Sequence, residues 1–231
     1  MKIAVINFSG NVGKSTIARN LLAPRIPDAE VFAVETINSD GTEDETMKGK
    51  EFGDLLEALQ LMDSAVVDLG ASNIEAVMTI MRLYRKSHED FDYYVVPVIP
   101  EPKQIRDTIS TINALSELGV PAKKIRVVFN KVEPGDEPTR VFAGLFNYHE
   151  AEKRFTLRPD AVLHVNEIYS RLNGKVVDLR EILNDPTDYK AKIKEATTQD
   201  EKLSFAQQLS VQRLAGGVID EHDAVFKTLL K

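Results

Sequence analysis

Four residues near the start of the chain, Gly-Lys-Ser-Thr at 13–16, have the types and the order that bind phosphate groups. A loop between a strand and a helix holds phosphate oxygens with its backbone N–H groups, and the helix N-terminus adds favourable potential. Lys14 would reach the β- and γ-phosphates of a nucleotide, Ser15 would bind Mg²⁺ through its hydroxyl, and Thr16 could contact the α-phosphate. The alternative is a chance glycine-rich turn at a helix start.

The turn before this motif departs from the commoner phosphate-binding loop. That loop has a glycine five residues before Gly13, where this chain has Phe8. Gly10 and Gly13 nevertheless permit a tight turn, because glycine adopts left-handed conformations without strain. Asn11 tolerates these conformations better than most residues do. We therefore expect the loop to form in spite of Phe8.

Residues 9–15 resemble the deviant Walker A motif K-G-G-x-G-K-[ST] of the ParA/MinD ATPases, which does not require a glycine at Phe8. Asn11 replaces one glycine of the motif, and Ser9 stands where the family has a signature lysine. That lysine crosses a nucleotide-sandwich dimer to the other subunit's nucleotide, which Ser9 cannot do for lack of charge and reach. The nucleotide-binding residues that the resemblance implies here are Ser9, Gly10, Asn11, Val12, Gly13, Lys14, Ser15 and Thr16.

A second segment of the chain, 65–70, resembles the Walker B and switch II region of the same ATPases. Asp68 lies near the end of an apolar run, and Gly70 follows two residues later. The resemblance implies that Asp68 holds a water molecule of Mg²⁺ and that the N–H of Gly70 approaches the γ-phosphate. The alternative is a strand-end aspartate that caps the next helix.

The switch I region is less well matched. Members of the family carry an aspartate after the second strand that positions the attacking water. At that position this chain has Ile37, but Asn38 or Asp40 could serve if the loop is shifted. We take Asp40 as the catalytic candidate, with Lys14 and Asp68. A plain acidic, solvated loop is the alternative.

The segment Asn-Lys-Val-Glu at 130–133 indicates which base is bound. In the family an asparagine after this strand bonds the adenine edge, and Asn130 fits that role, with Lys131 beside it. The segment also resembles the guanine motif N-K-x-D, but Glu133 is one methylene longer than aspartate and would misplace the contact. We therefore favour ATP over GTP. Asn130 as a mere turn residue is the alternative.

Within this class, residues 8–14 and 66–73 are closest to the small StbB-type plasmid stability proteins. These proteins are encoded on conjugative plasmids and are thought to act in plasmid maintenance and transfer. The resemblance implies a bacterial, cytoplasmic, plasmid-encoded protein and a DNA-binding partner protein. It also makes a nucleotide-dependent homodimer plausible.

The elements that must position these residues alternate along the chain. We predict strands at 3–6, 31–34, 65–69, 93–99, 125–129 and 161–165. We predict helices at 14–23, 51–61, 73–86, 103–118, 140–153 and 166–172, and a loop at 37–50. This alternation is typical of a three-layer α/β fold, an open and mostly parallel sheet with helices on both faces.

The C-terminal part contains no predicted strand from Asp188 onward. A capping box is predicted at 198–201, and Gly216-Gly217 is predicted to end the helix that follows it. We divide the chain into a nucleotide-binding domain, 1–186, and a helical tail, 187–231, packed on the domain or extending from it.

Composition excludes several classes of protein. The 231 residues include no cysteine, so disulfides and cysteine-ligated metals are excluded. The net charge of −7 makes direct DNA binding weak or absent. No segment approaches the length of about 18 apolar residues that a membrane span needs, and no signal peptide is expected.

Together these observations predict a Mg-ATP-binding, ParA-like P-loop ATPase that acts as a nucleotide switch and hydrolyses ATP slowly. A non-hydrolysing adaptor that binds ATP or ADP is the second hypothesis. A GTPase, or a kinase or ligase acting on a small metabolite, is a third, for which no acceptor-binding motif is visible.

Overall fold

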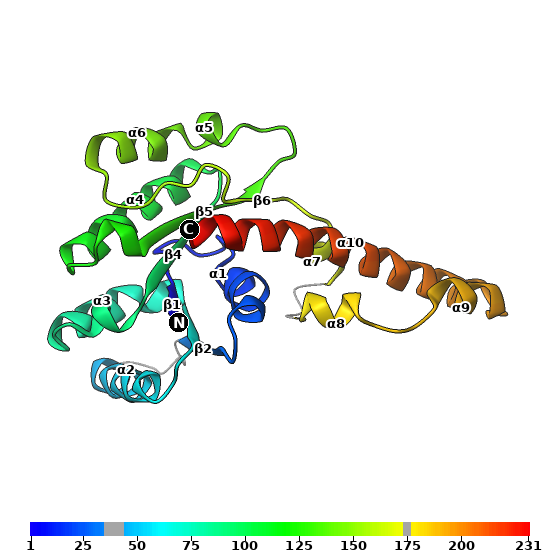
Figure 1. Ribbon diagram of the computed structural model, residues 1–231, viewed down its shortest axis with the longest axis horizontal. Helices are drawn as coiled ribbons and strands as arrows, with labels where there is room; N and C mark the ends of the chain where they lie inside the picture. Colours follow the sequence, from blue (N-terminus) through cyan, green and yellow to red (C-terminus); the bar gives the residue numbers. More distant parts are fainter. Residues whose placement is uncertain (35–43, 173–176) are drawn as a thin grey trace.

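The computed structural model describes residues 1–34, 44–172 and 177–231, with a parallel sheet at their centre (Figure 1). Its six strands follow the order β2-β3-β1-β4-β5-β6, and all neighbours are parallel. They are β1 (Lys2–Val5), β2 (Glu30–Val34), β3 (Ala65–Leu69), β4 (Tyr93–Val98), β5 (Ile125–Val132) and β6 (Val162–His164). The predicted open parallel sheet is therefore confirmed.

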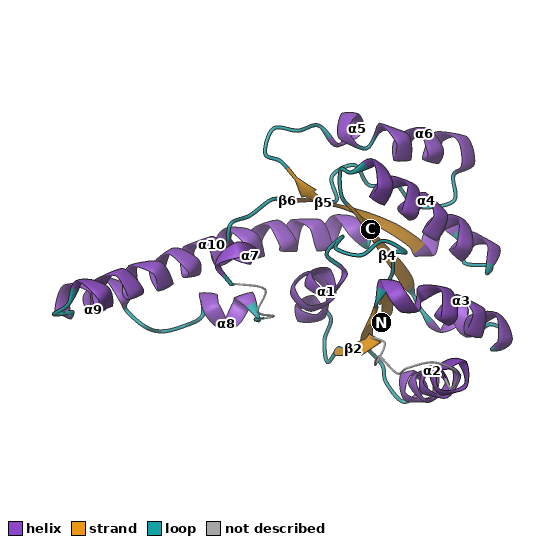
Figure 2. Ribbon diagram, turned by 180° about the vertical axis from the view of Figure 1, so that it is seen from behind, coloured by secondary structure: helices purple, strands orange, loops and turns teal. Residues whose placement is uncertain are grey.

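Helices follow the strands and cover both faces of the sheet (Figure 2). The α-helices are α1 (Lys14–Thr16), α2 (Asp44–Gln60), α3 (Ile74–Leu83), α4 (Pro102–Glu117), α5 (Pro138–Val141), α6 (Ala143–Glu152), α7 (Ile168–Arg171), α8 (Leu179–Leu183), α9 (Tyr189–Glu195) and α10 (Gln199–Leu229). Short π- or 3-10-helical segments are η1 (Ile17–Leu22), η2 (Ala23–Arg25), η3 (Ala71–Asn73), η4 (Ser87–Asp90) and η5 (Ala122–Lys124).

The central strands are buried on both faces, as continuous apolar runs in parallel sheets usually are. In β1, Ala4 faces the side covered by α2, α3, α4 and α6. Ile3 and Val5 face the other side, where they share a core with η1 and with Val225 and Leu229 of α10. The end of the C-terminal helix is thus part of the core that supports the first strand.

Helix α10 extends beyond the sheet together with α8 and α9 (Figures 1 and 2). A third apolar cluster lies there, formed by Ile168, Leu179, Ala215 and Val218. The first turns of α10 lie further out, and Leu203 is more than half exposed there. The C-terminal helix therefore joins the sheet to an outlying group of helices.

Two predicted boundaries in the first half of the chain are wrong. The predicted loop 37–50 is helical from Asp44 onward, while 37–43 lie outside the described residues. Helix formers such as Glu45, Met47 and Lys48 outweigh the single Gly49 there. The helix predicted at 73–86 ends at Leu83.

Two further differences lie around β5. The strand continues past 129 to Val132, because β6 pairs with it as far as His164, with a shift of register between Phe129 and Val132. The helix predicted at 140–153 is divided into α5 and α6 at Phe142, whose backbone is not helical. Phe142 is fully buried, and its ring centroid lies 4.8 Å from that of Phe129. Tertiary packing overrides the local helical pattern here.

The capping box at the start of α10 is confirmed, with Glu201 N–H donating to the Thr198 hydroxyl. The predicted end of this helix at Gly216-Gly217 is wrong, because the helix runs through both glycines to Leu229. Its buried stripe of Ala215, Val218, His222, Val225 and Leu229 continues on both sides of the glycines. Burial of that stripe outweighs the low helix propensity of glycine.

We expect Gly217→Ala to stabilise the protein by about 0.5–1 kcal/mol. Gly217 lies inside a regular helix, and an added Cβ would meet nothing within 4 Å. Alanine also reduces the conformational freedom of the unfolded chain. Urea unfolding monitored by circular dichroism measures the change. Gly13→Ala is the contrast and should destabilise, because its Cβ would lie 2.3 Å from Asn130 Nδ2. Equal changes in the free energy of unfolding of the two variants would contradict this account.

None of the helices in the described ranges is long and apolar enough to cross a membrane. Helix α10 has 31 residues, but charged side chains occur along its length. Its length therefore serves packing against α8, α9, η1 and the sheet.

Candidate functional site

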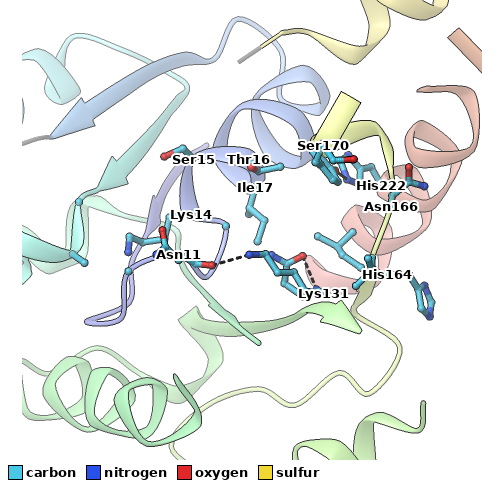
Figure 3. Close-up of a pocket in the computed structure, with 18 residues that line it drawn as sticks. Asn11, Lys14, Ser15, Thr16, Ile17, Lys131, His164, Asn166, Ser170 and His222 are labelled. Atoms are coloured by element: carbon cyan, nitrogen blue, oxygen red, sulfur yellow. Dashed lines mark hydrogen bonds between the residues drawn. The ribbon is translucent and has the colours of Figure 1, made fainter. Parts of the chain in front are cut away.

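A cavity of about 700 Å³ opens beside the loop between β1 and α1 (Figure 3). Of the predicted site residues, it is lined by Gly10, Asn11, Gly13, Lys14, Ser15, Thr16, Gly70, Asn130 and Lys131. These residues come from three separate stretches of sequence, at the ends of β1, β3 and β5. The carboxyl edge of a parallel sheet is where open α/β folds bind their ligands.

The loop takes its tight turn at Asn11 and Gly13. Asn11 has φ +59° and Gly13 has φ +89°, both in the left-handed region. Asn11 therefore adopts the left-handed backbone conformation that asparagine was expected to tolerate. Gly10 has no positive φ, so its conformational freedom is not what forms the turn. A side chain is excluded at Gly13 for two reasons. Its positive φ would strain any other residue, and an added Cβ would clash with the Asn130 amide.

Lys14 begins α1 and is 8% exposed. Its Nζ donates to the carbonyls of Asn7, at 3.1 Å, and Ser9, at 2.7 Å. Burial lowers the pKa of Lys14, and the carboxylate of Asp68 acts in the opposite direction. Two of the three ammonium protons are bonded to the loop, which leaves one for a ligand.

Hydrogen bonds to helix α4 hold the first residues of the loop in place. Asn7 is fully buried, and its amide donates to Thr108 Oγ1 at 2.7 Å and to the Pro97 carbonyl at 2.8 Å. The N–H of Phe8 donates to Thr111 Oγ1 at 3.0 Å. These bonds fix the loop through the protein's own contacts, so the binding of a ligand costs little further ordering.

Ser9 points away from the cavity. It is 1% exposed, and its hydroxyl donates to Asp107 Oδ2 of α4 at 2.8 Å. Lys103 donates to the same oxygen at 2.6 Å, and this hydrogen bond foremost lowers the pKa of Asp107. Val12 is also buried outside the cavity lining. Nucleotide contacts by Ser9 and Val12 stay predictions.

Asn130 and Lys131 connect the end of β5 to the loop. Asn130 Nδ2 donates to the Val12 carbonyl at 2.8 Å. Lys131 Nζ donates to the Asn11 carbonyl at 3.1 Å (Figure 3). Lys131 has φ +54° within the irregular end of β5, a feature that commonly redirects side chains beside binding sites. Asn130 therefore supports the loop, and its contact with a base stays a prediction.

Asp68 and Gly70 stand at the end of β3. Asp68 is opposite Val5 of β1 in the sheet and is almost fully buried. The N–H of Gly70 donates to the Val34 carbonyl at 3.1 Å, while Gly70 itself lines the cavity. Asp40 lies outside the described residues. The roles given to Asp68, Gly70 and Asp40 stay predictions.

The far wall of the cavity was missed by the sequence analysis. It is built from the end of β6, the segment that leads into α7, α7 itself and α10. From these elements His164, Asn166, Ser170 and His222 lie across from the loop (Figure 3). Asn166 follows a strand end, the same signal that singled out Asp68. Nothing in the sequence marks His222, because its neighbours on α10 are ordinary helix residues.

His222 connects the cavity wall to the core. Its Nδ1 lies 3.1 Å from the Asn20 carbonyl, and its Nε2 lies 3.2 Å from the Tyr169 hydroxyl. A carbonyl can only accept, so Nδ1 carries the proton and Nε2 accepts from Tyr169. Burial foremost lowers the pKa of His222 to about 4. The ring is therefore neutral near pH 7.

The described residues include no group of three or more His, Cys, Asp or Glu side chains that could hold a metal by themselves. Mg²⁺ does not need such a group, because it is usually bound by one or two protein oxygens, water and substrate phosphates. Ser15 in the cavity lining and Asp68 beside Lys14 offer that limited set.

No protein-family model matches this chain, and no curated protein sequence matches it. Solved structures do match it. MinD cell division protein of Aquifex aeolicus is 14% identical, with 94% of this chain and 97% of MinD covered and a TM-score of 0.51. The fold is that of the ParA/MinD P-loop ATPases. Apo McdA of Cyanothece is also 14% identical, with 91% and 98% covered and a TM-score of 0.52. At this identity the likeness concerns the ParA/MinD fold.

Proposed function

We propose that this protein binds Mg-ATP as a ParA-like P-loop ATPase and acts as a nucleotide switch in plasmid maintenance, partition and conjugative transfer. The observation that carries the proposal is Lys14, which is buried at the start of α1 beside a cavity at the carboxyl edge of the sheet. The ParA/MinD fold supports it. A cavity of about 700 Å³ falls within the range of roughly 300–1,000 Å³ that small-molecule sites have.

The role proposed for each site residue follows from where its side chain lies and which of its donors and acceptors are left for a ligand. Lys14 has one remaining ammonium proton for the β- and γ-phosphates. Ser15 and Asp68 would hold Mg²⁺, which neutralises phosphate charge when bound. Asn130 is proposed to recognise adenine through the amide hydrogen and lone pair left by its bonds to Val12 and Lys131.

Slow hydrolysis is proposed because of Ser9. A cation at this position would stabilise the charge that develops on the transferred phosphate. Ser9 brings no charge, and its hydroxyl already donates to Asp107. The same observation favours the second candidate function, a nucleotide-binding adaptor that does not hydrolyse ATP.

We further propose a nucleotide-dependent homodimer, a DNA-binding partner protein and a bacterial, cytoplasmic setting. Among the matching structures is MinD in complex with MinC, with a TM-score of 0.52. We propose residues 1–186 as the nucleotide-binding domain and 187–231 as a helical tail. The tail is a candidate partner surface, because α10 reaches from the cavity wall to the outlying helices.

Titration of the full chain with ATP, ADP and GTP, each with Mg²⁺, tests the proposal. Affinity is read by calorimetry, oligomeric state by light scattering and turnover by phosphate release. Tight ATP binding with slow release supports the ATPase, while tight binding without release selects the adaptor. Preference for GTP would overturn the adenine assignment, and no nucleotide binding would overturn the site.

We expect Ser9→Lys to raise ATP turnover about tenfold, because it places a cation at the position where the family's motif has one. Ser9→Ala is the matched control, since it removes the bond to Asp107 without adding charge. Phosphate release at saturating ATP is measured for both variants. Turnover that is the same in the lysine and alanine variants would mean that the missing lysine does not limit the rate.

A further inference from the structure

At the other end of β5 from Asn130, the side chain of Arg126 is buried without a hydrogen bond or ion pair to any described residue. Arg126 is 6% exposed, and its Nε is a buried donor without a partner. The guanidinium lies over the ring of Tyr93, 5.2 Å from the centroid. An arginine side chain keeps its charge at any ordinary pH. Contact with a ring face leaves the donors in the guanidinium plane without acceptors.

Arg126 lines a cavity of about 510 Å³, which we call the Arg126 cavity. Its charged side chains are Lys123, Lys124, Arg126 and Asp92. Asp92 already accepts a hydrogen bond from the N–H of Lys2, at 2.8 Å. Lys124 Nζ donates to the carbonyls of Glu89 and Phe91, so one of its protons is left. Three cationic side chains face one carboxylate, and this excess suits a doubly charged anion.

The Arg126 cavity is separate from the nucleotide site. No described residue lines both cavities. Arg126 and Asn130 are four residues apart on one strand, which places them about 13 Å from each other. A ligand in the Arg126 cavity would therefore lie at the amino edge of the sheet, while Lys14 lies at the carboxyl edge.

We propose that the Arg126 cavity binds a phosphate group, either as inorganic phosphate or as a small phosphate monoester. The planar guanidinium fork matches two oxygens of a phosphate, and such charge-assisted pairs are the strong ones. Tyr93 holds the guanidinium in place from one side. Lys123 and Lys124 add charge at the cavity wall.

Calorimetric titration of phosphate into the full chain carrying Lys14→Ala tests this site, since that background removes phosphate binding at the loop. Ionic strength is held constant with chloride. In this background Arg126→Met should weaken phosphate binding about tenfold, because the side-chain stem and its packing are kept while the fork is lost. Lys123→Gln, at an exposed position, should weaken it about threefold. Arg82→Gln, on the exposed surface of α3, is the matched control and should change nothing.

Glycerol phosphate in place of inorganic phosphate distinguishes the two sources of the phosphate group. Tighter binding of glycerol phosphate selects the monoester, and tighter binding of inorganic phosphate selects the free ion. Unchanged phosphate affinity in Arg126→Met overturns the proposal, as does acetate that binds as tightly as phosphate. Circular dichroism reports whether Arg126→Met folds. If it does not, unchanged affinity in Lys123→Gln overturns the proposal instead.

Discussion

Replacing Lys14 by alanine should abolish measurable ATP binding, with a loss of affinity of about a hundredfold or more. The ammonium group is held at the cavity by the carbonyls of Asn7 and Ser9, so its position is set before a nucleotide arrives. Asp68 supports its charge against the effect of burial. Alanine removes the charge and leaves the loop carbonyls without their donor.

Calorimetry with Mg-ATP measures the effect of Lys14→Ala, and thermal unfolding shows whether the variant folds. Lys131→Ala is the matched control, because Lys131 also lines the cavity and also donates to a loop carbonyl, that of Asn11. Its more exposed charge should matter less, with a loss of about fivefold. Unchanged ATP affinity in a folded Lys14→Ala protein would remove the basis of the nucleotide site.

The sequence predicted the fold because its signals are local. A run such as 65–69 is apolar but for Asp68, and a strand buried on both faces is the element that uses such a run in an α/β protein. The loop at 9–15 was predicted for the same reason, since strand, turn and helix follow one another directly. The structure has this order, with β1, the turn at Asn11 and Gly13, and then α1.

The parts that could not be predicted depend on residues far apart in the sequence. Ser9 bonds Asp107, and Asn7 bonds Thr108, each about a hundred residues further along the chain. His222 reaches Asn20, 202 residues away. No short window of sequence contains such pairs. The predicted helix end at Gly216-Gly217 is wrong for the same reason, because the burial that keeps these glycines helical comes from other elements.

Lowering the pH from 7 to 4 should reduce the free energy of unfolding by about 3 kcal/mol through His222 alone. Burial foremost, and then Arg25, lower its pKa from 6.5 to about 4, against the hydrogen bond to the Asn20 carbonyl and the charge of Asp223. Below pH 6.5 the unfolded chain binds the proton first. The contribution is therefore complete above pH 6.5, and it is lost as the pH falls towards 4.

His222→Gln separates this effect from other acid titrations. Glutamine can donate to the Asn20 carbonyl and accept from Tyr169, but it does not titrate. Urea unfolding is measured at a series of pH values from neutral to acid. The free energy of unfolding of His222→Gln should depend less steeply on pH than that of the parent protein. His149→Gln is the matched control, because His149 of α6 contacts the ring of Phe155 rather than Asn20 or Tyr169. It should keep the parent's slope. His222 lines the cavity and connects α10 to Asn20 and Tyr169. Protonation of its ring at acid pH should therefore weaken ATP binding in the parent more than in His222→Gln. A parental slope in His222→Gln would show that this histidine is not the group responsible.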